Sequence, residues 1–345
     1  MTTPVVEPTP AVPRERGWRS VVGGLVLLLL LPAMPPFSVI VPVAETALVL
    51  VPVLAACALA GWKAGGRLFL AVLWVAFAAW IVAAGPVRSE YSLLARGWGV
   101  LVAVAFGAWA LVWPDRPFLP RALATVGVAL LVGGVATLAV PGGTVRVRQV
   151  VGTELLRRAD SFETDWKARL ATKDWQDFRA SSAESAAWFE RTLEEQRGMV
   201  RSAAERSATI FPALLALETL AALGLAWALY HRVGRARIGV PLARLREFRF
   251  NDQFIWGLVV GLLLVVVPGL GFARGAGANL LVFFGALYAL RGAGVTLFIL
   301  APGRVMTVVL VGASVLFAGA AGVIFLGLGL GDTWLDWRRR TRPST

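Results

Sequence analysis

The sequence predicts an all-α, polytopic helical membrane protein with about 8–9 transmembrane helices and one extracytoplasmic helical insertion. Hydrophobic residues make up 57% of the 345-residue chain and charged residues 16%, whereas a soluble domain is about half apolar and a quarter charged. Nearly uncharged stretches recur, and many approach the roughly 20 residues that cross a bilayer. The net charge of +13 lies mainly between these stretches, as in cytoplasmic loops, and not on one face that would bind nucleic acid.

The composition divides the chain into five parts. Residues 1–16, rich in proline and threonine, predict a disordered tail. Residues 17–140 predict a first transmembrane bundle of about five spans. Residues 141–208 predict an amphipathic helical segment outside the membrane, residues 209–337 a second transmembrane bundle, and residues 338–345 a basic tail.

Apolar stretches predict the individual spans. The first is short or kinked, because Pro32, Pro35 and Pro36 interrupt it. In the last, Gly327 and Gly331 have the Gly-x-x-x-Gly spacing that serves helix packing. The expected spans lie near residues 20–34, 41–61, 68–85, 92–113, 121–140, 209–230, 254–272, 278–300 and 305–331.

Lysine and arginine set the predicted orientation, because they are enriched in cytoplasmic loops. With five spans before residue 141, the basic segments 14–19, 63–67, 116–121 and 232–249 fall on one side. We therefore expect a multi-pass protein of the cell (inner) membrane with a cytoplasmic N-terminus. Three further spans would put the arginines at 338–340 outside, against the same rule. The side of the C-terminus stays open: the last stretch re-enters, or one span is miscounted.

The middle segment carries the period of an amphipathic helix. Phe162, Trp166 and Leu170 recur at four-residue spacing, and charges fill the faces between them. One long helix fits this pattern, as do two helices folded as a hairpin near residues 172–182. The apolar stripe packs on itself or on the membrane surface in one interpretation, and forms a partner-binding lid over a site between the spans in the other.

Ionisable residues within the predicted spans are the candidate site. Glu45, Glu218 and Arg291 interrupt apolar runs, and a charge in hydrocarbon costs several kcal/mol unless it is paired. Arg291 is a possible partner for either glutamate, and Tyr288 and Asn279 precede it on the same predicted helix. The pattern fits a salt bridge that fixes helix packing, and it also fits a ligand or proton site.

Basic and aromatic residues at the borders of the last spans predict interfacial anchors next to anionic lipid. The bilayer is thus an expected partner, and nucleic acid is not. The predicted anchors are Arg244, Arg246, Arg249, Trp256, Trp334, Trp337 and Arg338.

Motifs for catalysis are absent from the sequence. It contains no Gly-x-x-x-x-Gly-Lys-Ser/Thr phosphate loop, no Gly-x-Ser-x-Gly and no His-Glu-x-x-His. His231 is the only histidine and Cys57 the only cysteine, which argues against a metal site built from these ligands. We expect no enzymatic activity, no cofactor and no metal.

Two stretches of the C-terminal half resemble a known family. They are Leu287-Tyr288-Ala289-Leu290-Arg291-Gly292 and the ending Gly329-Leu330-Gly331-Asp332-Thr333-Trp334-Leu335-Asp336-Trp337-Arg338. They resemble the YybS-like predicted bacterial membrane proteins, whose function is unknown, with Arg291 and Trp337 as departures from the usual pattern. That family is distantly similar to the substrate-binding S-components of energy-coupling-factor transporters, which bind small molecules and rely on separate ATPases.

Two functions follow as hypotheses. The first is a small-molecule-binding or transport component without its own ATPase, with its cavity between the spans that carry Glu45, Glu218 and Arg291. The alternative is a non-transporting structural or regulatory scaffold that recruits membrane or cytoplasmic protein partners through the 143–208 helices or the 232–249 loop.

Overall fold

The computed structural model describes residues 18–30, 35–84, 89–234 and 237–340, and every regular element within them is helical. Six of the described helices are long and apolar enough to cross a membrane. The predicted all-α polytopic fold class is therefore confirmed. The predicted disordered tail, 1–16, lies outside the described residues, as do positions 341–345 of the predicted basic tail.

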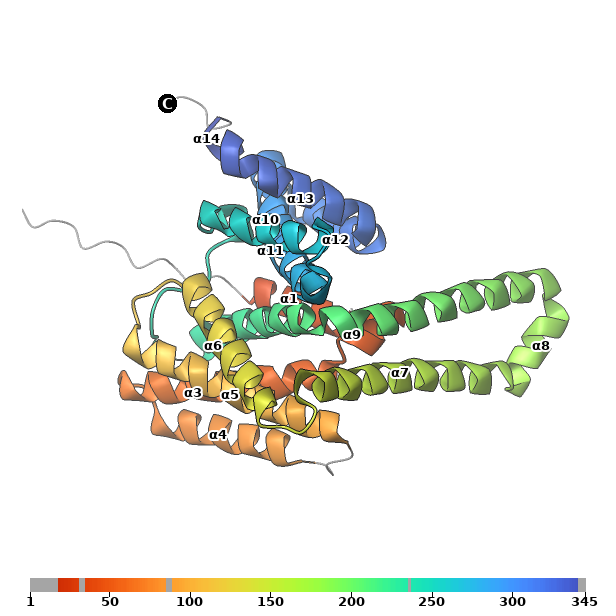
Figure 1. The fold of residues 1–345 in the computed structure, drawn as a ribbon, viewed down its shortest axis with the longest axis horizontal. Helices are drawn as coiled ribbons and strands as arrows, with labels where there is room; N and C mark the ends of the chain where they lie inside the picture. Colours follow the sequence, from red (N-terminus) through yellow and green to blue (C-terminus); the bar gives the residue numbers. More distant parts are fainter. Residues whose placement is uncertain (1–17, 31–34, 85–88, 235–236, 341–345) are drawn as a thin grey trace, which may run out of the picture.

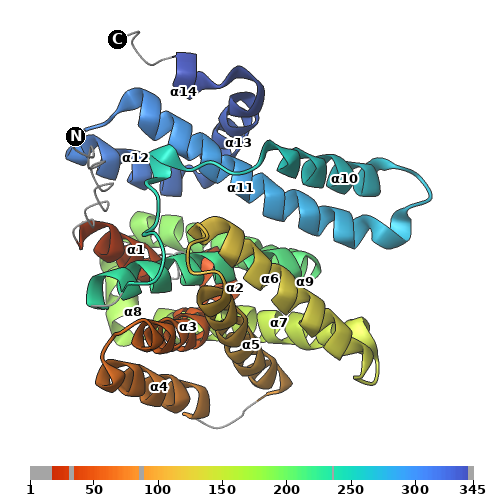
Figure 2. The same ribbon diagram turned by 90° about the vertical axis from the view of Figure 1, so that its left-hand side faces the viewer.

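The N-terminal helices form a bundle together with the second half of the long helix α9. Figure 2 shows this bundle on one side of α9 and the C-terminal helices on the other, and α9 contacts both α3 and α11. The helices are α1 (Arg19–Leu30), α2 (Pro35–Ile40), α3 (Val43–Lys63), α4 (Leu68–Ala83), α5 (Glu90–Val112), α6 (Phe118–Leu138), α7 (Gly143–Leu170), α8 (Lys173–Ser181) and α9 (Ala183–Val233).

Aromatic and small side chains fill the core between α3, α5, α6 and α9. Trp227 of α9 is fully buried and meets Phe106 of α5 edge to face, with 5.7 Å between the ring centroids. The indole N–H of Trp227 donates to the carbonyl of Val240 at 3.1 Å, so its polar atom is satisfied. Gly99 of α5 lies against the backbone carbonyl of Leu48 in α3, where any Cβ would collide. The absence of a side chain there lets the two helices approach closely.

Helices α7, α8 and the first half of α9 form an arm that projects beyond the bundle (Figure 1). This hairpin turns at α8, within the predicted range 172–182. The predicted stripe packs on itself: Trp166 lies 6.0 Å from Phe162 and 6.1 Å from Phe189 of α9, centroid to centroid. Trp175 of α8 joins them, 5.1 Å from Phe189. This aromatic cluster gives the arm a core of its own, outside the bundle.

The C-terminal helices are shorter than predicted in two places. Helix α10 has 12 residues and α12 has 13, so each reaches only about 18–20 Å at 1.5 Å per residue. The prediction of one span over 305–331 is wrong, because α12 ends at Leu316 and α13 begins at Ala318. The helices are α10 (Ile255–Val266), α11 (Arg274–Leu300), α12 (Arg304–Leu316), α13 (Ala318–Leu335) and α14 (Trp337–Arg340), with 3₁₀ turns at Leu245–Glu247, Asp252–Phe254 and Gly271–Ala273.

The end of the chain lies against the basic loop that follows α9. Asp336 forms an ion pair with Arg249 at 2.5 Å, and Arg338 donates to the carbonyl of Phe248 at 3.0 Å. Segments in such direct contact lie on one side of a membrane. The break between α12 and α13 thus removes the conflict with the positive-inside rule that an unbroken last span creates.

Helices α11 and α13 cross in backbone contact at two glycines. A Cβ on Gly292 would collide with the carbonyl of Phe325, and a Cβ on Gly329 would collide with the carbonyl of Tyr288. Gly327, which the sequence singles out by its spacing, has no atom within 4 Å of an added Cβ. The helix contact therefore uses the glycine two residues further along.

This crossing predicts opposite outcomes for two neighbouring substitutions. Gly329→Ala forces the helices apart and should destabilise the protein by about 1–3 kcal/mol, as overpacking does. Gly327→Ala, the matched control, should be neutral or slightly stabilising because alanine is the better helix former. Thermal unfolding of the purified protein in detergent, followed by tryptophan fluorescence, measures both. Equal midpoints for the two variants would contradict the crossing.

Candidate functional site

The structure separates the predicted intramembrane polar residues into three places. Glu45 and Glu218 lie together at one cavity, while Arg291 and Tyr288 lie between α11 and α13. Asn279 bonds to α9. The expected pairing of Arg291 with Glu218 or Glu45 is wrong, because Arg291 has two aspartate partners of its own.

Arg291 is buried and compensated by two carboxylates. Its Nε lies 2.9 Å from Oδ2 of Asp332 in α13, and its Nη1 lies 2.6 Å from Oδ1 of Asp252 at the start of the 3₁₀ turn before α10. Arg338 donates to the carbonyl of Arg291 at 3.4 Å. The two stretches that carry the family resemblance are thus bonded to each other. Such a network fixes helix packing, because Asp332 and Asp252 balance the buried charge of Arg291.

Tyr288 supports the same network from one turn away. It is fully buried, its hydroxyl donates to the carbonyl of Asp252 at 3.4 Å, and its ring packs 5.0 Å from that of Phe250. Neither Tyr288 nor Arg291 lines the cavity of Glu218. Their contacts assign them a structural role.

Asn279 replaces a backbone hydrogen bond in α9. Pro212 has no amide hydrogen, and it lies in a helix that continues for 51 residues. Next to it, Ala213 N–H donates to Asn279 Oδ1 at 2.8 Å, and Asn279 Nδ2 donates to the carbonyl of Thr209 at 3.0 Å. Those two backbone groups are the pair that an uninterrupted helix would join. Asn279 therefore ties α11 to the proline site of α9.

Most predicted interfacial anchors lie on the surface. Trp256 and Trp334 are exposed, as are Arg244, Arg246 and Arg249. Trp337 is half-buried. Arg338 differs from the prediction, because it is buried and donates to two backbone carbonyls of the protein instead of reaching into water.

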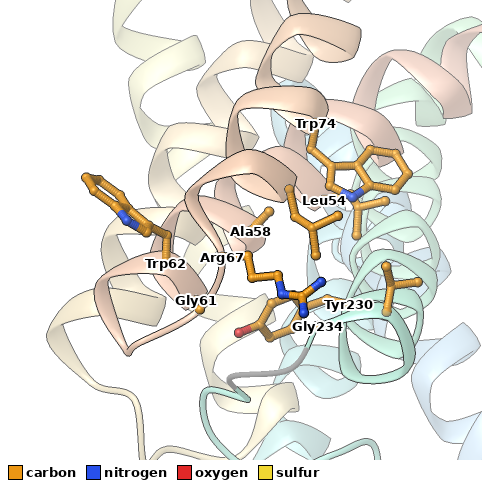
Figure 3. A pocket seen from close by; sticks show the side chains of 11 residues that line it. Leu54, Ala58, Gly61, Trp62, Arg67, Trp74, Tyr230 and Gly234 are labelled. Atoms are coloured by element: carbon orange, nitrogen blue, oxygen red, sulfur yellow. The ribbon is translucent and has the colours of Figure 1, made fainter.

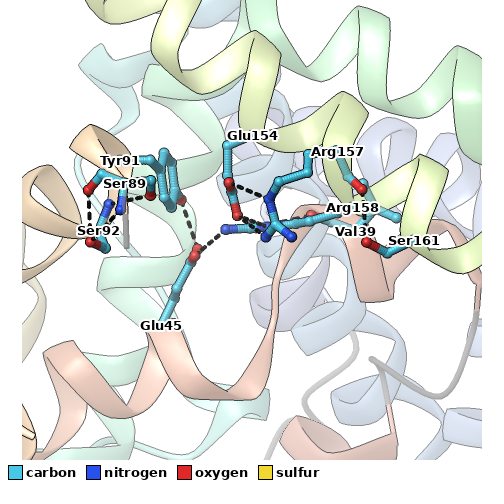
Figure 4. Close-up of polar contacts among 9 residues, drawn as sticks. All are labelled: Val39, Glu45, Ser89, Tyr91, Ser92, Glu154, Arg157, Arg158 and Ser161. Atoms are coloured by element: carbon cyan, nitrogen blue, oxygen red, sulfur yellow. Dashed lines mark hydrogen bonds and ion pairs between the residues drawn. The ribbon is translucent and has the colours of Figure 1, made fainter. Parts of the chain in front are cut away.

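A polar network joins the arm to the bundle (Figure 4). Arg158 of α7 forms an ion pair with Glu45 of α3, and it also bonds Glu154 at 3.0 Å and the carbonyl of Val39 at 3.1 Å. Tyr91 of α5 donates to the second oxygen of Glu45 at 2.7 Å. Three helices thus meet at one carboxylate, and each charge in the group has an opposite charge beside it.

Glu154 lies at the outer end of this network. The Arg157 guanidinium, which donates to both of its oxygens, and then that of Arg158 hold the pKa of this carboxyl below its ordinary value of 4.5. A lowered carboxyl pKa stabilises the folded state above 4.5, and this contribution fades as the pH falls through the folded-state value. Glu154 is therefore charged at neutral pH.

A cavity of about 710 Å³ opens beside this network, between α3, α5, α6, α7 and α9. Glu45 and Glu218 lie in its wall with Tyr91, Trp98 and Phe211, and most of the remaining lining is apolar. A volume of this size is in the range of small-molecule sites, where a few polar groups set orientation in an apolar pocket. The cavity lies where α6 gives way to α7 at Gly142 and Gly143, whose positive φ values of 86° and 52° form the corner.

Glu218 is the polar group of this cavity with the least compensation. Thr46 donates to its Oε1 at 2.7 Å. Within the described part of the chain, no ion pair joins Glu218 to a basic side chain. A neutral hydroxyl does not balance a carboxylate in low dielectric, so Glu218 is suited to bind a proton or a cation.

A second pocket lies between α3, α4 and the end of α9 (Figure 3). Its lining includes Trp74, Arg67 and Tyr230, but its volume is only about 30 Å³. This is enough for water and not for a solute. Among the described residues, no three histidine, cysteine, aspartate or glutamate side chains form a group that would hold a metal ion.

The site includes residues that the sequence did not single out. Arg158 is one of many charged residues in the amphipathic segment, and nothing in the spacing distinguishes it. Tyr91 and Trp98 are aromatic residues near the start of a predicted span, where such residues are common. Thr46 directly follows Glu45, but its hydroxyl donates to Glu218, so its position in the chain does not signal this contact either.

These features define an all-α, multi-pass membrane protein whose N-terminal bundle holds a mostly apolar cavity with two carboxylates in its wall. Residues 168–333 match the model of a family described as "Predicted membrane protein (DUF2232)". The match covers part of the arm, the rest of α9 and most of the C-terminal helices, and it begins after the cavity-lining helices α3, α5 and α6. No curated protein and no solved structure matches the chain.

The network at Glu45 predicts unequal effects for two adjacent arginines. Arg158→Gln leaves Glu45 half-buried without its cation and should destabilise the protein by about 3 kcal/mol, with faster hydrogen exchange in α7. Arg157→Gln is the control. The Arg157 side chain is 63% exposed against 13% for Arg158, so its loss should cost less than about 1 kcal/mol. Thermal unfolding and hydrogen exchange measure both variants. Equal losses of stability in the two would contradict a stabilising role for the Arg158–Glu45 ion pair.

Proposed function

We propose that this protein is a solute-binding component of a membrane transport system that has no catalytic activity or ATPase of its own. The observation that supports it is the 710 Å³ cavity with Glu218 in its wall. The cavity is apolar enough to hold an organic solute, and the carboxylate is free of any ionic partner within the described residues. The resemblance to YybS-like proteins, and more distantly to S-components, favours the same role.

The orientation follows from the basic segments. We assign the protein to the cell (inner) membrane with its N-terminus in the cytoplasm. The loop after α9 and the C-terminal segment would then face the cytoplasm, and the arm would project to the other side. On this assignment the cavity lies on the same side as the arm, next to the ion pair between Arg158 and Glu45.

The projecting arm supports a second candidate, a scaffold that recruits a protein partner. The tip of the arm lies outside the bundle (Figure 1) and exposes Trp188 and Phe178. Replacing α8 with a glycine-serine linker leaves Arg158 and the cavity intact. A solute-binding protein keeps its ligand after this change, whereas a scaffold loses its crosslinked partner.

A cavity-filling substitution tests solute binding. Gly97 lies in the cavity wall, and an added Cβ there has no atom within 4 Å. Gly97→Trp should fill the space and remove any small molecule that co-purifies with the wild type, while Gly97→Ala should retain it. Mass spectrometry of extracts from the purified proteins measures the difference. The same small molecules in all three preparations, or none in the wild type, would contradict the proposal.

A further inference from the structure

The charges around the cavity indicate what kind of solute it takes. We infer that the cavity binds an apolar organic cation, with Glu218 as its counter-ion. This inference rests on the proposed function, since it names the ligand class of the same cavity. Three observations support it: Glu218 has no ionic partner among the described residues, the ring of Trp98 lines the cavity, and the residues around its opening are largely aliphatic.

The acidic and basic groups at the arm compensate one another. Glu45 and Glu154 are matched by Arg157 and Arg158, which bond them directly. Glu218 stands outside this balance, with the Thr46 hydroxyl as its hydrogen-bond donor. A carboxylate in an apolar environment is stabilised by a cation that replaces the water it has lost. Apart from Arg148, which is exposed at the edge of the cavity, the remaining charge is that of Glu218, and a bound cation would balance this carboxylate.

Trp98 lines the cavity with its aromatic ring and offers no free hydrogen-bond donor there. Its indole N–H donates to Thr219 Oγ1 at 2.9 Å, so its only polar atom is already used. The surface left to line the cavity is the π system, whose face attracts cations. Tyr91 shows this chemistry in the same wall, because the Arg158 guanidinium lies 4.9 Å from the centre of its ring.

The mouth of the cavity is largely aliphatic, and its exposed polar side chains are Thr144, Arg148 and Thr209. Most of the exposed lining side chains of α5, α6, the turn after α6 and the start of α7 are aliphatic. In a bilayer such an opening adjoins lipid, so it admits a solute that partitions into the membrane. The exposed aliphatic residues are Leu93, Leu94, Leu130, Val132, Val140 and Val145.

Arg148 is the one feature that favours an anion. It lines the cavity from α7, but it is exposed and forms no ion pair with Glu218 or another described residue. Water solvates an exposed arginine and weakens its attraction for a bound anion, whereas Glu218 is in the apolar wall. Because Glu218 lies further inside than Arg148, the cavity favours a cation. Binding of an anion at Arg148 is the alternative result that the experiment below can show.

Two probes of the same shape and opposite charge test the inference. Tetraphenylphosphonium and tetraphenylborate are added to the purified full-length protein in lipid nanodiscs, and equilibrium binding of each is measured. We expect tetraphenylphosphonium to bind the wild type more tightly by about tenfold or more. Glu218→Gln, which keeps an oxygen to accept from Thr46, should abolish this preference. Glu205→Gln, an exposed position on the same helix with a side chain 60% exposed, should keep it.

Each outcome decides the question. Equal binding of the two probes, no binding of the cation, or an unchanged preference in Glu218→Gln would overturn the inference. Tighter binding of tetraphenylborate that is lost in Arg148→Gln would show an anion site instead. The wild-type comparison needs no variant, so misfolding of Glu218→Gln cannot hide the result. Loss of co-purified solute in Gly97→Trp tests the cavity separately, so a failed charge preference leaves the proposed function standing.

Discussion

Arg158 reaches from the arm to Glu45 in the wall of the first bundle, and much of the arrangement depends on this contact. It ties α7 to α3 beside the cavity, with Glu45 itself in the cavity wall. A charge near hydrocarbon is stable only with an opposite charge beside it. The requirement is met here by a residue 113 positions away, which joins two segments that hydropathy alone would treat as independent.

The same requirement organises the C-terminal half in a different way. Arg291 has two carboxylate partners and a glycine crossing beside it, so its charge stabilises packing and leaves nothing for a ligand. Glu218 has a hydroxyl donor and a cavity. Charged residues within the spans therefore have two different roles in this protein: Arg291 stabilises helix packing, and Glu218 is available to a ligand. The number of oppositely charged partners distinguishes the two roles.

Hydropathy predicted most of the helices because the cost of an unbonded backbone in lipid leaves few alternatives to a helix. The spans near 41–61, 92–113, 121–140 and 278–300 are present as α3, α5, α6 and α11. The break at Phe317 was not predicted as such, since a glycine-rich apolar run reads the same whether it forms one helix or two. The candidate site was predicted in part: Glu45 and Glu218 share a cavity, but Arg291 is not their partner.

The sequence by itself determined that the chain is a helical membrane protein, where its charges interrupt apolar runs, and that the middle segment is amphipathic and helical. These properties depend on local periodicity and on the transfer free energy of side chains, both of which are written in consecutive residues. Only the tertiary structure decided which charges meet. Arg158 and Glu45, or Arg291 and Asp332, are brought together by the paths of several helices, and no local pattern encodes a distance between residues far apart in the chain.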